Sequence, residues 1–131
     1  MRVPSSHRLR VGVSQDAVLV TEKVFDAGAD VTIGGDESAA LVVAGWAGPT
    51  LLLILGEDRL LHLQPGMRLI MCNDDGSERV DGEFEELVAK GMVPPLQITV
   101  RSRLNIRVRK GISVFAHYLS EETPRRRPAD C

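Results

Sequence analysis

The chain has 131 residues, of which 44% are hydrophobic, 26% are charged and only 4% are aromatic. This length is typical of one domain with a substantial core, and the formal net charge of -2 gives no electrostatic reason to expect a nucleic-acid partner. Because aromatic residues are few, the core has to be built mostly from valine, leucine and isoleucine, which suit the inward faces of a sheet.

The sequence carries no export or membrane signal. Cys72 and Cys131 lie far apart, unlike the cysteines of a secreted disulfide framework. No apolar run approaches the roughly 20 residues that span a bilayer, and the first residues lack the apolar segment of a signal peptide. We therefore expect a cytoplasmic protein that does not insert into a membrane.

The first elements alternate polar and apolar residues. Residues 1–7 are polar and contain Pro4, which predicts a disordered lead-in. Residues 8–13 and 17–25 alternate with a period of two around a short polar link, a pattern typical of a β-hairpin. The ordered domain is therefore expected to begin near Arg8.

The stretch from Asp30 to Leu55 contains three apolar runs separated by two glycine-containing turns, at residues 34–36 and 45–49. This pattern predicts three strands joined by two loops. Paired glycines are typical of turns with positive φ, so we expect Gly34 and Gly35 to make a sharp turn that exposes backbone N–H groups. Such loops are where β-sandwiches place their binding sites.

The middle of the chain continues with a hairpin formed by residues 50–55 and 59–63, then a Pro-Gly turn and a strand over residues 67–72. Residues 73–77, Asn-Asp-Asp-Gly-Ser, are a strong turn signal. Phe84, Leu87 and Val88 follow helical spacing between early glutamates and Gly91, so one short helix is expected over residues 83–90.

Three further strands are predicted at residues 96–101, 104–109 and 112–119, and the polar, proline-rich tail at 120–131 is expected to be disordered or to begin a linker. About eleven short strands with nearly regular turns predict an all-β antiparallel sandwich over residues 8–119 with at most one short helix. The apolar positions of these alternating strands are expected to face the core. They are Val11, Val13, Ile33, Leu53, Leu69, Ile98, Val100, Ile106 and Val114.

The groups that catalysis or metal binding needs are scarce. His7 falls in the lead-in, while His62 and His117 alternate with apolar residues in predicted strands, where a sheet-face role is the ordinary one. Asp74 and Asp75 lack the spacing of a calcium loop, so a solvated turn is the simpler interpretation. We expect no enzyme activity, no cofactor and no metal.

Basic residues gather near the C-terminal end of the predicted sheet. Arg101, Arg103, Arg107, Arg109 and Lys110 alternate with apolar residues, so they are expected on a solvated sheet face away from the glycine loops. The alternative is a surface for an anion or an acidic partner. Trp46, the only tryptophan, is either an exposed anchor for a partner or a cap on the core.

The segment VTIGGDES at residues 31–38, the short apolar strand at 41–43, and the patterns at 61–67 and 104–119 resemble the forkhead-associated (FHA) domain. The chain is similar to FHA-like modules at the N-termini of TonB-like and gliding-motility proteins of myxobacteria. The resemblance covers about residues 8–119, and it implies an eleven-stranded sandwich that reads phosphothreonine in partner proteins.

The family's phosphate-binding residues have no clear counterparts here. Gly35 occupies the place of a phosphate-contacting arginine, and Gly-Trp-Ala-Gly-Pro-Thr at residues 45–50 replaces the family's Ser-x-x-His element. The family's Asn-Gly pair also has no clear counterpart in this chain. The resemblance therefore implies an FHA-like scaffold without its usual phosphothreonine site.

The resulting hypothesis is a non-catalytic adaptor or scaffold module that binds a protein partner and is a monomer or weak homo-oligomer. The alternatives are a self-assembling component of a bacterial cytoskeletal or motility complex and a phospho-dependent adaptor. The residues expected to bind the partner belong to the two glycine loops and the basic cluster. They are Gly34, Gly35, Asp36, Glu37, Ser38, Trp46, Thr50, Arg107 and Arg109.

Overall fold

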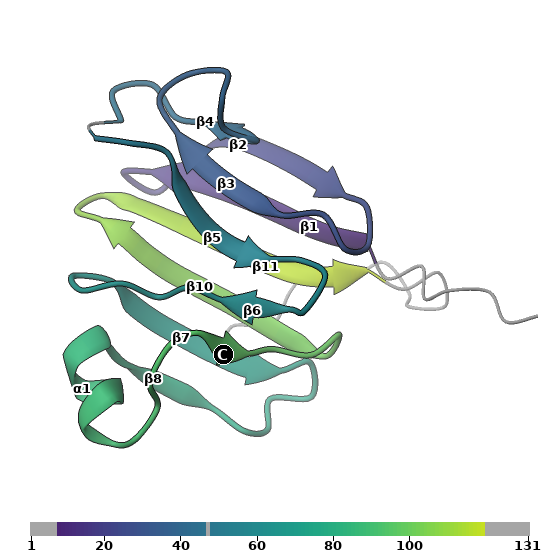
Figure 1. Cartoon of the computed structure of the whole chain (residues 1–131), viewed down its shortest axis with the longest axis vertical. Coiled ribbons are helices and arrows are strands. Elements are labelled where there is room, and N and C mark those ends of the chain that lie inside the picture. The colour runs from purple at the N-terminus through teal and green to yellow at the C-terminus, as the bar shows by residue number, and fades with distance from the viewer. Residues whose placement is uncertain (1–7, 47, 120–131) are drawn as a thin grey trace, which may run out of the picture.

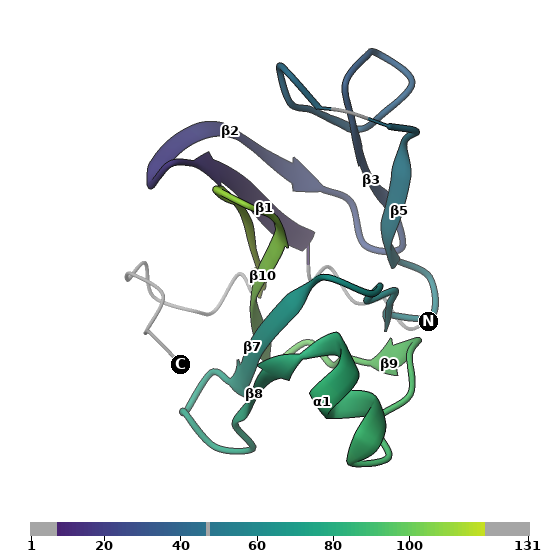
Figure 2. The same cartoon turned by 90° about the vertical axis from the view of Figure 1, so that its left-hand side faces the viewer.

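The computed structural model describes residues 8–46 and 48–119 of the chain. The predicted lead-in at 1–7 and tail at 120–131 lie outside these residues. The described part folds into two sheets that pack face to face, with one short helix at their edge (Figures 1 and 2). The predicted all-β sandwich of about eleven strands is confirmed.

The larger sheet has six strands in the order β2-β1-β11-β10-β7-β8. Its strands are β1 (Arg8–Gln15), β2 (Val18–Phe25), β7 (Arg68–Asn73), β8 (Val80–Glu83), β10 (Ser102–Arg109) and β11 (Ile112–Leu119). All its pairings are antiparallel. The smaller sheet has five strands in the order β4-β3-β5-β6-β9, and only β3 and β4 pair in parallel. Its strands are β3 (Val31–Gly34), β4 (Leu41–Val42), β5 (Leu51–Leu55), β6 (Leu60–Leu61) and β9 (Leu96–Gln97).

The core lies between the two sheets and is built from the alternating apolar positions of the strands. In β10, Leu104, Ile106 and Val108 are buried while Arg107 and Arg109 are exposed, as period-two alternation requires. Eight of the nine core residues expected from the sequence are buried. Val100 is the exception, because it lies half-buried in a turn.

The predicted strand over residues 96–101 is wrong beyond Gln97. The Thr99 backbone N–H donates to the Ser102 hydroxyl at 3.0 Å, and the Thr99 hydroxyl accepts from the Arg101 N–H at 3.1 Å. Such local side-chain bonds compete with the strand ladder, so the chain turns at Val100 and Arg101. The link expected at residues 102–103 is instead the start of β10.

The short helix α1 (Phe84–Ala89) forms where the sequence predicts it. The Glu83 N–H donates to the Glu86 side chain at 2.9 Å, and the Glu83 side chain accepts from the Glu86 N–H, which makes a reciprocal capping box. Leu87 is the buried residue of the helix. Among the described residues, no helix has the length and apolar character needed to cross a membrane.

The turns fall into two groups at opposite ends of the strands. The β1–β2, β3–β4, β4–β5 and β10–β11 connections gather at the left in Figure 1, whereas the β7–β8 and β9–β10 connections lie at the right. We call the first group the loop end and the second the far end. Because β10 runs between them for eight residues, its two ends are separated by about 25 Å at a strand rise of about 3.3 Å per residue.

Candidate functional site

Two loops pack directly against each other at the loop end. A Cβ placed on Gly34 would lie 2.7 Å from the Thr50 hydroxyl oxygen, and a Cβ on Gly35 would lie 3.1 Å from the Trp46 carbonyl oxygen. Neither glycine is among the residues with positive φ, so the expected left-handed turn is wrong. Glycine is required here for close approach between the β3–β4 and β4–β5 loops.

The β3–β4 loop is held by its own hydrogen bonds. One Asp36 carboxylate oxygen accepts from the Ser38 hydroxyl at 2.5 Å and from the Ser38 N–H at 2.9 Å. The Ser38 hydroxyl also lies 3.0 Å from that of Thr50. The Ser38 hydroxyl and then its N–H lower the pKa of the Asp36 carboxyl below the ordinary value. Glu37 stands exposed beside this turn.

Trp46 is a cap on the core and not an exposed anchor. Its side chain is only 9% exposed and belongs to the core cluster. The indole Nε1 donates to the Pro49 carbonyl at 3.2 Å, which fixes the orientation of the ring. The Arg109 guanidinium carbon lies 4.3 Å from the ring centroid, the distance of a cation–π contact. Trp46 therefore acts as a platform on which Arg109 rests.

The basic cluster expected on one sheet face is divided between the two ends of β10. Arg109 lies at the loop end, and its contact with Trp46 contradicts the expectation that the cluster stays away from the glycine loops. A register shift between Arg107 and Arg109 interrupts the pairing of β10 with β11 at this point. Such irregularities redirect side chains. Arg107 contacts Glu83 at 3.8 Å.

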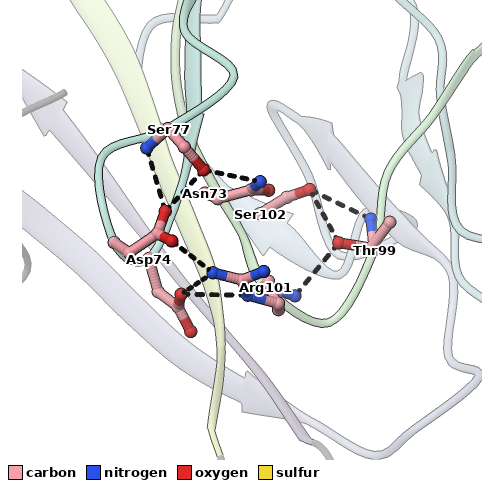
Figure 3. Close-up of polar contacts among 7 residues, drawn as sticks. Asn73, Asp74, Ser77, Thr99, Arg101 and Ser102 are labelled. Atoms are coloured by element: carbon pink, nitrogen blue, oxygen red, sulfur yellow. Dashed lines mark hydrogen bonds and ion pairs between the residues drawn. The ribbon is translucent and has the colours of Figure 1, made fainter.

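Arg101 lies at the far end and holds the Asn73–Ser77 turn (Figure 3). Its Nη2 lies 3.1 Å from an Asp74 oxygen and 2.8 Å from an Asp75 oxygen. The other Asp75 oxygen accepts from the Ser77 hydroxyl at 2.6 Å and from the Ser77 N–H at 2.9 Å. The predicted turn is confirmed, and Arg101 pairs with both of its aspartates.

Asp75 is expected to remain ionised at unusually low pH. The Ser77 hydroxyl, the Ser77 N–H and Arg101 hold its pKa at about 2, below the ordinary 3.8. Between these values the unfolded chain binds more protons than the folded chain, so this contribution to stability is lost as the pH falls from about 3.8 to about 2. Carbon-detected NMR titration of the Asp75 carboxyl measures the pKa. A Ser77→Ala variant should raise it, and an unchanged value in that variant would contradict the assignment.

Among the described residues, the histidines and the cysteine lie away from the loop end. His117 is in β11, and burial followed by the charges of Arg10 and Arg103 lowers its pKa below 6.5. His62 follows β6, and its backbone N–H donates to the Leu53 carbonyl at 2.8 Å. Cys72 is buried in β7 and is not a free thiol, unlike the isolated cysteine that the sequence indicates.

Seven of the nine predicted partner-binding residues meet at the loop end through the contacts described above. They are Gly34, Gly35, Asp36, Ser38, Trp46, Thr50 and Arg109. Glu37 is exposed in the same loop, and Arg107 contacts Glu83 at the end of β8. Gly48 and Pro49 belong to the loop predicted at residues 45–49 and join this arrangement, although they were not among the predicted partner-binding residues. No family model, curated protein or solved structure matches the chain, so its function is argued from this geometry.

Proposed function

We propose that the chain is a non-catalytic protein-interaction module, an FHA-like scaffold that binds its partner at the loop end. One observation supports this. The two glycine loops pack against each other, and Arg109 of β10 contacts Trp46 in the second loop, so the three form one exposed surface. Binding sites on sandwiches are commonly built from loops that a rigid scaffold positions. Here the scaffold fixes the loops through Trp46, which is buried beneath them.

The chemistry of the loop end supports binding rather than catalysis. The Ser38 hydroxyl is the nucleophile within the β3–β4 loop, but its described neighbours are the Asp36 carboxylate and the Thr50 hydroxyl. A serine nucleophile needs an adjacent base whose pKa lies near neutrality, whereas the pKa of Asp36 is lowered. Neither neighbour is suited to activate Ser38 at neutral pH.

The same contacts argue against recognition of a phosphate. Gly35 has no side chain that could donate a hydrogen bond to a phosphate, and the Ser38 hydroxyl already interacts with Asp36 and Thr50. Charge-assisted hydrogen bonds contribute roughly 1.5 to 3 kcal/mol each. Loss of two such bonds weakens binding by about two to four powers of ten. The neighbouring Asp36 carboxylate would also repel a phosphate dianion.

We therefore expect no phosphate-dependent affinity at micromolar concentration. Isothermal titration of a phosphothreonine peptide library beside its unphosphorylated twin measures this, with Gly35→Arg as a second protein. A Cβ at Gly35 lies 3.1 Å from the Trp46 carbonyl, so this variant needs a melting curve to show that the loops still pack. Low-micromolar or tighter binding of the phosphorylated set to the native chain would replace this proposal with a phospho-dependent adaptor.

Self-association through β2 is the second candidate, and exposed apolar residues on that strand favour it. β2 is an edge of the larger sheet, and Val18, Leu19 and Val20 are 62%, 56% and 48% exposed. Edge strands of this kind can pair with another copy. The bulge near Leu19 and the charged Lys23 oppose it. Size-exclusion chromatography with light scattering decides, because a monomer at all concentrations excludes self-association.

A further inference from the structure

We propose that Arg109 anchors an acidic side chain, Asp or Glu, of an extended segment in the partner protein. This inference rests on the proposed function and names the chemistry that the loop end recognises. It follows from the way in which Arg109 is held, from the absence of an acidic neighbour among the described residues, and from the glycine backbone beside it.

Arg109 is positioned before any partner arrives. Its guanidinium lies over the Trp46 ring at 4.3 Å, and that ring is fixed by burial and by the bond from Nε1 to the Pro49 carbonyl. A guanidinium that stacks on an aromatic ring does so through its flat face. The N–H groups at its edge therefore remain available for a bidentate bond to a carboxylate, and little side-chain entropy is lost on binding.

The positive charge of Arg109 is not neutralised within the described part of the protein. Five other arginines there form ion pairs with carboxylates: Arg10, Arg68, Arg79, Arg101 and Arg107. Arg109 differs from them, because no described carboxylate lies within 4.0 Å of its guanidinium. The adjacent Lys110 is likewise without an ion pair among these residues and adds a second cation. The surface around Arg109 thus has the charge that an acidic side chain complements.

The loop beside Arg109 contains two glycines, and one of them adjoins the guanidinium. A Cβ on Gly48 would lie 3.4 Å from the Arg109 Nη2, and a Cβ on Gly45 would meet nothing within 4 Å. Both glycines have positive φ, +98° and +81°, which disfavours other residues. The Gly48 backbone therefore adjoins the guanidinium without a side chain, so a partner segment would meet main chain at this position.

The surrounding charges favour a single acidic residue over a polyacidic run. Asp36 and Glu37 lie in the loop that packs on the Trp46 backbone, while Arg109 covers the Trp46 ring. A segment rich in acids would meet repulsion from these two carboxylates. A partner segment that places one carboxylate on Arg109 and neutral or basic residues near Asp36 and Glu37 complements both the positive and the negative part of this surface.

The test selects short, unphosphorylated random peptides displayed on phage against the native chain and measures each binder with four proteins. These are the native chain, Arg109→Gln, Arg109→Lys, and Arg101→Gln as a control that removes an equal charge at the far end. We expect binders to share one Asp or Glu. Arg109→Gln and Arg109→Lys should each weaken binding by about tenfold or more, since lysine cannot make the planar bidentate contact, while Arg101→Gln leaves it unchanged.

The peptide's own acid provides the second half of the test. Replacing it by Asn or Gln should weaken binding to the native chain by the same factor and have little further effect on Arg109→Gln, because the two groups act as one pair. Binders that map to the loop end but lack an acid, or that are unaffected by Arg109→Gln, overturn the role of Arg109 and leave the interaction module standing. Failure to select any peptide at the loop end overturns both. Tighter, Arg109-dependent binding of a phosphorylated peptide overturns the choice of carboxylate.

Discussion

Replacing Ile106 by alanine is expected to lower the free energy of unfolding by about 2 to 4 kcal/mol, through lost transfer energy and the cavity left behind. Ile106 is fully buried, and in the register of the larger sheet it stands opposite Val114 of β11 and Leu69 of β7. Both of these neighbours are also fully buried. Little movement is available to close the cavity, because the side chain lies at the centre of three paired strands.

Urea unfolding measures this effect, with Val24→Ala as the matched control. Val24 lies on the edge strand β2 and is 42% exposed, so its truncation should change stability by less than about 0.5 kcal/mol. If Ile106→Ala shifts the midpoint by no more than the control does, then Ile106 does not face the core and the assigned phase of β10 is wrong.

Gly56→Ala is expected to be at least as damaging, for a different reason. A Cβ on Gly56 would lie 1.8 Å from the Ala29 carbonyl oxygen and 2.5 Å from its carbon. These are backbone atoms that no rotamer change can move. The Gly56 N–H also donates to the Asp30 carboxylate at 3.1 Å, so a shift of the β5–β6 turn would break a second contact. We expect a loss of about 3 kcal/mol or more.

Gly66→Ala is the control for Gly56→Ala. Gly66 has a φ of +91° and open space at its Cβ position, so alanine there suffers only the cost of the left-handed conformation, about 1 to 2 kcal/mol. Thermal unfolding of the two variants compares a steric cost with a conformational cost. Equal or smaller destabilisation by Gly56→Ala would show that the approach of the two turns is not as close as described.

Elements whose signals are local could be predicted from the sequence. Alternation alone places β1, β2 and β11 with nearly correct bounds, and the glutamates around Phe84 locate the capped helix α1. The turn at residues 73–77 follows from its Asn, Asp and Gly residues. In each case the residues that determine the structure lie within a few positions of one another.

Two kinds of feature could not be predicted from the sequence. One kind depends on side chains that compete for backbone hydrogen bonds, and the other depends on contacts between distant residues. The strand β9 ends after Gln97 because Thr99 and Ser102 satisfy the local backbone, which alternation does not reveal. The stacking of Arg109 on Trp46 joins β10 to a loop far away in the sequence. The reason for glycine at positions 34 and 35 is likewise the approach of another loop, and a single sequence does not distinguish this from a need for positive φ.

The most direct test of the loop end as the binding surface is a comparison of amide spectra of the isotope-labelled chain with and without a display-selected peptide. We expect the perturbed amides to belong to residues 34–38, Gly45, Gly48 and Arg109, and those of β2 and of the Asn73–Ser77 turn to remain unchanged. Perturbations that follow β2 from Val18 to Val24 and leave the loop end unaffected would contradict this expectation.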